Sequence, residues 1–296
     1  MHLSVGCRLR QPGPAAHPAP AFLLAASLLF LSACGSGGPI QIGLAGSLSD
    51  PVGVPMKHAA ELAVEEINAQ GGIHGRPLEL VERDDYADPD SAVFVATDLY
   101  EAGVAAVIGH LFSGTTLAAA PVYNGGSDPV VAVSPSSSSP DISTAGEYTF
   151  RICPSDLAHG AALARWVHDT LGFQRGAVLY LNDQYGRGVR QTFVKDFTRR
   201  GGVLESIDPY LGDVPQVGPY LDRLAKAGGA DFLVVAGNRG EAEEILRQAK
   251  PGDTLLIAGK GHETYQEFED TIVPFDDRVQ ARETLETLGW KDADGR

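Results

Sequence analysis

Short apolar segments alternate with amphipathic segments from Ile40 onward, and this alternation constrains the fold more than any other feature of the chain. The strand-like runs of the first half lie at 40–46, 78–85, 104–109 and 130–134. Helical patterns fall between them at 55–69, at 89–102 and after 113–116. Strands that alternate with helices predict parallel sheets with right-handed crossovers. We therefore predict an α/β fold built from doubly wound parallel sheets.

The same alternation continues through the second half of the chain. Strands are predicted at 176–181, 203–207 and 231–237, and helices at 156–171, 187–199, 217–227 and 240–249. For the first helix, 55–69, helical spacing predicts an apolar face made of Ala59, Leu62, Ala63 and Ile67.

The N-terminal segment is typical of an export signal. Residues 21–31 (AFLLAASLLFL) follow two arginines and are apolar throughout, but the run is too short to span a bilayer. It ends in Leu31-Ser32-Ala33-Cys34, which resembles a bacterial lipobox. We predict a signal peptide over 1–34, lipidation of Cys34 and a flexible tether over 35–39, so the chain is exported and membrane-anchored as a periplasmic or cell-surface lipoprotein. An ordinary secretory signal with an incidental cysteine is the alternative.

Composition and motifs argue against several functional classes. The 23 basic and 38 acidic residues give a net charge of −15, which disfavours a nucleic-acid partner. The chain has no CxxC pair, and its eight histidines show no ligand spacing, so no metal site or cofactor is predicted. Cys153 is expected to be a small buried residue. No GxSxG, GxGxxG or phosphate-loop motif occurs, and the chain is not expected to be an enzyme.

Polar clusters follow several predicted strands, at 47–50, 113–116, 134–139 and 182–185. Ligands of parallel α/β sheets collect beyond the carboxyl ends of the strands, which is where these clusters fall. Hydroxyl groups and helix N-terminal amides bind a carboxylate without reacting with it. The clusters therefore predict a binding site for a small molecule.

Three motifs are similar to those of leucine/isoleucine/valine-binding proteins, the receptors of branched-chain amino-acid ABC transporters. They are INAQGGIHGRPLEL with the following DDYADP, VIGHLFSGTT and NDQYGRG, and the resemblance extends over about 40–250. It implies a type I periplasmic binding protein with one lobe over 40–153 and a partial second lobe over 154–250. In this family the lobes close about a hinge on an amino acid, without chemistry.

The resemblance also implies a set of ligand contacts. Ser113 matches the serine that binds the ligand carboxylate, and Thr115 lies beside it. Ser136 and Ser138 match the next contact loop, and Tyr185 matches an aromatic contact from the second lobe. A further aromatic contact of the family falls near 238, where this chain has an asparagine.

Each of these contacts has a structural alternative. Ser113 could be only a helix cap, the serines at 136–139 only a polar loop, and Tyr185 only an exposed aromatic. Asp84 is a weaker candidate, because a turn or capping role is more typical of its position.

The last stretch, 251–296, resembles a different family. LLIAGKGHETYQ and PFDDR are similar to the C-terminus of the Mur ligases that add the third amino acid to UDP-N-acetylmuramoyl-dipeptide. The matching positions Gly259 and Glu263 contact a diamino acid in that family. Its ATP-binding loop and Asn-Pro-Arg motif are absent from this sequence, so no ligase activity is expected. A strand is predicted at 254–258 and a helix at 277–288.

The junction near 249–251 has a functional implication. In the binding proteins, the acid that holds the ligand ammonium lies beyond this point, and Glu263 is a poor replacement. The resemblance therefore implies a truncated and replaced C-terminal part, with weak binding and poor solubility.

Together these observations favour an extracytoplasmic solute-binding lipoprotein that captures an amino acid for an ABC permease. Alternatives are a sensor-type or non-functional fusion, or an inactive ligase fragment.

Overall fold

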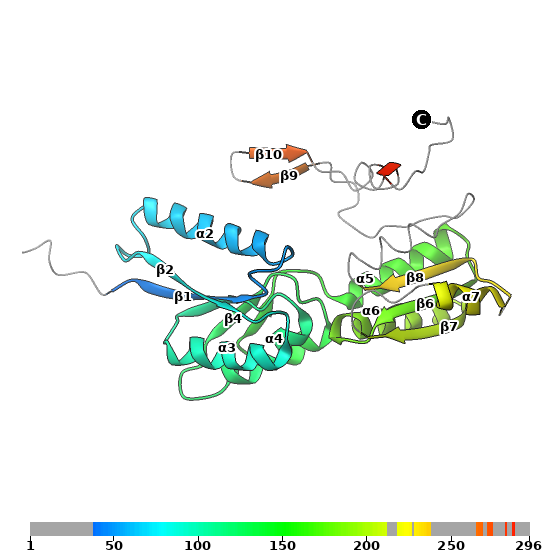
Figure 1. The fold of residues 1–296 in the computed structure, drawn as a ribbon, viewed down its shortest axis with the longest axis horizontal. Coiled ribbons are helices and arrows are strands. Elements are labelled where there is room, and N and C mark those ends of the chain that lie inside the picture. Colours follow the sequence, from blue (N-terminus) through cyan, green and yellow to red (C-terminus); the bar gives the residue numbers. More distant parts are fainter. Residues whose placement is uncertain are drawn as a thin grey trace, which may run out of the picture.

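The computed structural model describes residues 38–211, 218–226, 228–237, 265–268, 271–274, 282 and 286–287. The described residues form two α/β units that follow one another along the long axis of the molecule (Figure 1). Both sheets are parallel, as the alternation of strands and helices predicts.

The first unit contains a five-stranded sheet with strand order β2-β1-β3-β4-β5. Its strands are β1 (Ile40–Gly46), β2 (Leu78–Asp84), β3 (Ala106–Gly109), β4 (Val131–Ser134) and β5 (Thr149–Arg151). Its helices are α2 (Val54–Ala69), α3 (Pro89–Glu101) and α4 (Ser113–Asn124), followed by the short 3-10 helix η1 (Pro140–Thr144).

Helices cover both faces of this sheet (Figure 1). On one face, α3 and α4 pack over the central strands around Leu99, Val107 and Tyr123, all at most 1% exposed. On the other face, α2 packs Ala60 against Leu44 of β1. The result is a three-layer arrangement in which strand β1 is covered on both faces, by Ala45 contacts on one side and Leu44 contacts on the other.

The predicted apolar face of α2 is wrong for three of its four residues, and the fourth, Ile67, is half-buried. Ala59, Leu62 and Ala63 are exposed, with Leu62 at 45%. The face that packs on the sheet carries Met56 and Ala60 instead. The helix contains two apolar stripes at helical spacing, and periodicity alone cannot select the one that meets the sheet.

The second unit contains a three-stranded sheet with strand order β7-β6-β8. Its strands are β6 (Arg175–Leu181), β7 (Val203–Tyr210) and β8 (Phe232–Ala236). Its helices are α5 (Asp156–Arg165), α6 (Gln184–Arg199) and α7 (Gly218–Lys226). Phe193 and Phe197 stack at 5.4 Å between ring centroids, and the Phe232 ring meets Phe197 edge-on at 5.1 Å. This aromatic cluster joins α6 to the sheet.

Several elements depart from the predicted boundaries. The helix predicted over 156–171 is α-helical only to Arg165, and a π turn follows over Trp166–Thr170. Strand β5 and helix η1 are absent from the predicted set, because three- to five-residue elements contain too little pattern to detect.

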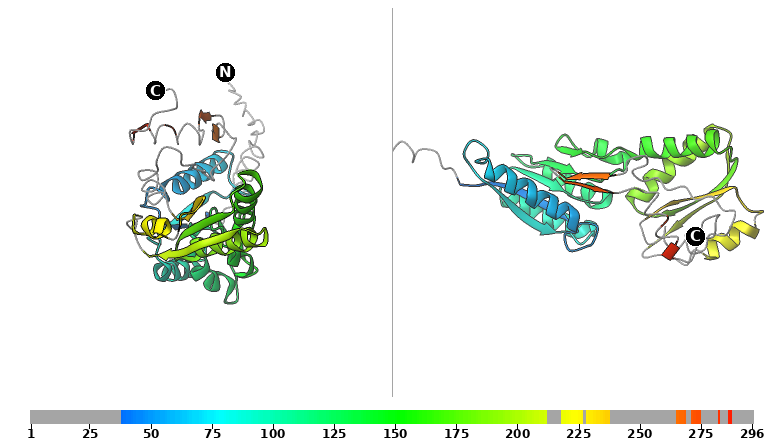
Figure 2. Two further views of the ribbon diagram at one scale, coloured as in Figure 1. Left: turned by 90° about the vertical axis from the view of Figure 1, so that its right-hand side faces the viewer. Right: turned by 90° about the horizontal axis from the view of Figure 1, so that it is seen from above.

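The described part of the tail forms one antiparallel pair, β9 (Tyr265–Phe268) with β10 (Thr271–Pro274). It is a two-stranded sheet separate from the two parallel sheets (Figure 2). The helix predicted at 240–249 and the strand predicted at 254–258 lie outside the described residues, as does most of the helix predicted at 277–288. Within the described ranges, no helix is long and apolar enough to cross a membrane.

Candidate functional site

The first turn of α4 supplies uncommitted hydrogen-bond donors. The N-cap residue is Phe112, and no side chain caps the helix. The amides of the first turn therefore have no acceptor within the helix, and they carry the positive end of its dipole. Ser113 is the first residue of α4, so the idea that it acts only as the helix cap is wrong.

The Ser113 hydroxyl lies at the contact between α4 and the loop after β4. It is 3% exposed, and its Oγ accepts a hydrogen bond from the Ser139 amide at 3.2 Å. A hydroxyl that accepts still has its own proton to donate. Thr115 differs, because its hydroxyl donates to the Phe112 carbonyl at 3.0 Å and that proton is already committed.

The segment Ser134–Ser139, called the serine loop below, is tied to the main chain before α4. The Ser134 hydroxyl donates to the His110 carbonyl at 2.6 Å, and the Ser136 hydroxyl donates to the Leu111 carbonyl. Ser138 is 7% exposed, and its carbonyl accepts from the Asp156 amide at 2.9 Å. The serine loop therefore joins the start of α4 to the start of α5.

Asp156, at the start of α5, was not predicted as a site residue. It is 0% exposed, and neither carboxylate oxygen has a hydrogen-bond partner among the described residues. His159 Nδ1 approaches to 3.6 Å, which is beyond hydrogen-bonding distance. Burial raises the pKa of Asp156, while Ser138 and then His159 act in the opposite direction. A buried acid without a hydrogen bond is costly, and such groups occur where a ligand supplies the partner.

Tyr185, in the first turn of α6, is half-buried beside this acid. Burial raises the pKa of its hydroxyl, and the nearby Asp156 and Asp183 carboxylates raise it further. Tyr185 also packs against the core of the second unit, so it is not an exposed loop aromatic.

The two units meet closely at Gly188 of α6. A Cβ at this position would lie 3.0 Å from Asp156 Oδ2 and 3.0 Å from Pro140 Cδ. Glycine therefore allows α6 to approach the end of the serine loop. This contact brings Ser113, the serine loop, Asp156 and Tyr185 into one region at the junction of the units.

Asp84 braces a loop. Its carboxylate accepts from the Ser49 amide at 2.9 Å, from the Ser49 hydroxyl at 2.6 Å and from the Tyr86 amide at 2.8 Å. Burial acts to raise the pKa of Asp84, but these hydrogen bonds lower it overall. The arrangement favours the turn role over ligand contact.

The remaining predicted positions give little structural information. Cys34, Asn238, Gly259 and Glu263 lie outside the described residues. Cys153 is a free, partly buried thiol. Across the described ranges, no group of three or more His, Cys, Asp or Glu side chains could hold a metal ion.

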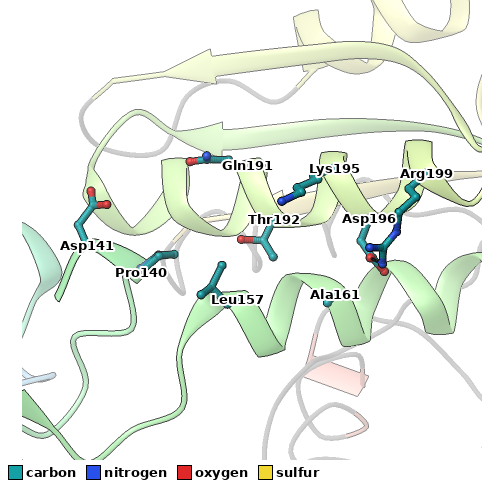
Figure 3. Close-up of a pocket in the computed structure, with 9 residues that line it drawn as sticks. All are labelled: Pro140, Asp141, Leu157, Ala161, Gln191, Thr192, Lys195, Asp196 and Arg199. Atoms are coloured by element: carbon teal, nitrogen blue, oxygen red, sulfur yellow. Dashed lines mark hydrogen bonds and ion pairs between the residues drawn. The ribbon is translucent and has the colours of Figure 1, made fainter. Parts of the chain in front are cut away.

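A pocket of about 360 Å³ lies along the groove between α5 and α6 (Figure 3). Leu157 and Ala161 come from α5, and Lys195 and Arg199 come from α6. Arg199 is paired with Asp196, which neutralises part of the charge of the groove. None of the predicted contact residues lines this groove.

The region contains hydrogen-bond donors from Ser113 and α4 and a buried acid, Asp156. Ser113 and the α4 amides suit an anionic group, and Asp156 suits a cationic group. Within the described residues, no hydroxyl or thiol is hydrogen-bonded to a histidine ring in the way that nucleophilic catalysis requires, apart from the buried Tyr123. The arrangement supports binding of a small molecule with both charges.

Residues 39–254 match the family described as "Periplasmic binding protein". The chain belongs to the periplasmic binding protein family. The "Leucine-specific-binding protein" of Salmonella typhimurium is 32% identical over 216 residues, covering 71% of this chain and 58% of that protein. A binding protein of Pseudomonas aeruginosa, named for leucine, isoleucine, valine, threonine and alanine, is 33% identical, with 71% and 57% covered.

Solved structures of this family share the fold. The branched-chain amino acid transporter substrate binding protein LivJ from Streptococcus pneumoniae, in complex with isoleucine, matches with a TM-score of 0.64 and 26% identity, covering 71% of this chain and 60% of that one. An ABC transporter substrate-binding protein from Desulfitobacterium hafniense, in complex with Leu, matches with a TM-score of 0.57 and 31% identity, covering 70% and 62%. The chain thus spans about 58% of the length of the curated relatives it matches.

Proposed function

We propose that this protein captures an amino acid between its two α/β units and presents it to an ABC permease. The observation that carries the proposal is Asp156, a buried acid without a hydrogen-bond partner, in the same region as Ser113. An α-amino acid has a carboxylate and an ammonium close together, and it satisfies both groups at once.

Each end of the amino acid has a proposed contact. The ligand carboxylate accepts from the Ser113 hydroxyl and from the first-turn amides of α4. The ammonium donates to Asp156 and to Ser138, and Tyr185 packs against the side chain of the ligand. In this proposal Asp156 replaces the acid that the resemblance places beyond 250. Weak binding was expected mainly because that acid is missing, so we no longer expect it.

The relatives support the transport role. Proteins named for leucine, isoleucine and valine binding are 31–33% identical to this chain over the 216 or 217 aligned residues. Closure of two lobes on the ligand needs no chemistry, and we propose no enzymatic activity. Export and anchoring through a lipid on Cys34 follow from the lipobox-like sequence. A sensor of the same fold would share these features, and the transport names of the relatives favour the permease as partner.

We propose a separate origin for the tail from about 251, based on the motifs LLIAGKGHETYQ and PFDDR. In this proposal Gly259 and Glu263 are vestigial contacts of a ligase segment without a nucleotide site. Incubation with ATP, a diamino acid and UDP-N-acetylmuramoyl-dipeptide should give no ADP release.

Isothermal titration of the full chain tests the binding function. L-Leucine should bind with a measurable heat. 4-Methylpentanoic acid lacks the amine and 3-methylbutylamine lacks the carboxylate, so neither should bind at tenfold higher concentration. Equal binding of 4-methylpentanoic acid would refute the ammonium contact and indicate a receptor for simple carboxylates.

A further inference from the structure

Three buried polar side chains, Asp85, His110 and Tyr123, form a hydrogen-bonded chain next to the candidate site. None of the three is a proposed ligand contact. His110 Nδ1 lies 2.6 Å from Asp85 Oδ2, and His110 Nε2 lies 3.1 Å from the Tyr123 hydroxyl. All three side chains are at most 1% exposed. The three side chains connect the end of β2, the end of β3 and the C-terminal end of α4.

The proton positions in this chain follow from its chemistry. The Asp85 carboxylate accepts from Nδ1–H, and it also accepts from the Ala87 amide at 2.9 Å. In the neutral ring Nε2 is then an acceptor, and the Tyr123 hydroxyl donates to it. Burial raises the pKa of Tyr123, and the Asp85 charge raises it further, so the hydroxyl keeps its proton. The His110 ring is therefore held on both of its nitrogens.

The main chain at His110 and Leu111 is the support on which the serine loop rests. The His110 carbonyl accepts from the Ser134 hydroxyl at 2.6 Å and from the Thr116 hydroxyl at 3.1 Å. The Leu111 carbonyl accepts from the Ser136 and Ser137 hydroxyls. The ring of His110 is thus fixed by the polar chain, while its carbonyl fixes the serine loop.

We propose that the Asp85–His110–Tyr123 chain is a positioning device that holds the serine loop and Ser113 in the ligand-accepting arrangement. The positioning role itself does not depend on the proposed function; only the expected effect on ligand affinity rests on that function. None of its three side chains needs to contact the ligand. The carbonyl oxygens of His110 and Leu111 hold the hydroxyls of the serine loop by hydrogen bonds. The Ser139 amide of that loop in turn holds Ser113 Oγ.

The test measures amide hydrogen exchange in the ligand-free full chain. The Ser137 amide bonds Ser134 Oγ at 3.1 Å and the Ser139 amide bonds Ser113 Oγ at 3.2 Å, so both report the position of the serine loop. In His110→Leu these two amides should exchange at least tenfold faster. The Ala105 amide, which bonds Gln41 across the sheet, should change much less and is the internal reference.

Two other variants separate positioning from general destabilisation. In His110→Asn the amide nitrogen can take the place of Nδ1 toward Asp85, and exchange should return toward the wild-type rate. Thr149→Val removes the partly buried hydrogen bond from Asn124 Nδ2 at the C-terminal end of α4, beside Tyr123 but without contact to the His110 carbonyl, and it should lower the melting temperature without speeding exchange at Ser137 and Ser139. Tyr123→Phe, which removes one oxygen, is measured in the same way if His110→Leu does not fold.

The outcomes distinguish this inference from the proposed function. Unchanged exchange at Ser137 and Ser139, relative to Ala105, in His110→Leu, or in Tyr123→Phe if His110→Leu does not fold, would overturn the positioning role, whatever ligand the protein binds. If L-leucine binds the wild type, His110→Leu should weaken it at least tenfold and Thr149→Val less than twofold. A wild type that binds no amino acid would overturn the proposed function and leave the exchange result standing on its own.

Discussion

Replacing Asp156 by asparagine should stabilise the ligand-free chain and weaken amino-acid binding at the same time. Asparagine has nearly the same shape and no charge. The carboxylate is fully buried and lacks a hydrogen bond among the described residues, so its ionisation is penalised in the folded state. A buried polar group without a partner costs about 1–3 kcal/mol, and a charged group costs more. Asparagine keeps the cost of a buried polar group and removes only the extra cost of the charge, so we expect Asp156→Asn to gain on the order of 1 kcal/mol of stability.

The pH dependence has a definite sign. Burial raises the folded-state pKa of Asp156, so the folded chain binds this proton more tightly than the unfolded chain does. The cost is therefore present at neutral pH and is relieved as pH falls through the raised pKa. The melting temperature of Asp156→Asn should exceed that of the wild type at pH 7, by about 2–4 °C per kcal/mol for a domain of this size. The difference should shrink toward acid pH.

Ligand binding should change in the opposite direction. A hydrogen bond to a charged group contributes about 1.5–3 kcal/mol, which is roughly a 10- to 100-fold change in Kd for L-leucine. Wild-type affinity should also fall as pH falls through the raised pKa, because the protonated acid no longer attracts the ammonium. Asp156→Asn should lack this pH dependence.

Differential scanning fluorimetry and isothermal titration at several pH values give both quantities. Asp141→Asn is the matched control, because Asp141 is an exposed acid on the adjoining helix η1. It should change neither stability nor affinity. A melting temperature of Asp156→Asn below that of the wild type at pH 7, together with unchanged leucine affinity, would refute the assignment of Asp156 as an unpaired ligand-binding acid.

Three further predictions concern single positions. Ser113→Ala removes the hydroxyl proposed to bind the carboxylate and should cost about 1–3 kcal/mol of binding free energy in calorimetric titration, so an unchanged Kd contradicts that contact. Gly188→Ala places a Cβ 3.0 Å from Asp156 Oδ2 and Pro140 Cδ, and this overpacking should lower the stability measured by urea unfolding by about 1–3 kcal/mol. Cys34→Ala should leave the precursor uncleaved by the lipoprotein-specific peptidase, and mass spectrometry that finds the wild-type mature N-terminus would reject the lipobox interpretation.

Much of the fold follows from local pattern. Strands β1, β3, β4 and β6 are near-continuous apolar runs, as expected for parallel strands buried on both faces. Glycines and capping groups mark most helix ends, so the boundaries of α2, α3 and α7 lie within one or two residues of their predicted positions. Polar clusters after the strands also indicated where a site would form, because parallel strands end at a common edge.

Features that depend on contacts between distant segments could be determined only from the tertiary structure. Which stripe of α2 meets the sheet is set by the shape of the strands beneath it, and the sequence contains both stripes. Asp156 follows Ser155, which looks like an ordinary helix start. Only its burial against Ser138 and the approach of Gly188 from α6 make it an unpaired acid.

The same reason explains Asp85 and His110. They are 25 residues apart, and neither lies in a recognisable motif with the other. Hydrophobic periodicity in a sequence shows which residues are buried, because buried positions recur with the period of the helix or strand that contains them. A buried hydrogen bond between two strands has no such period, and it appears only when the sheet places the ends of β2 and β3 on either side of β1.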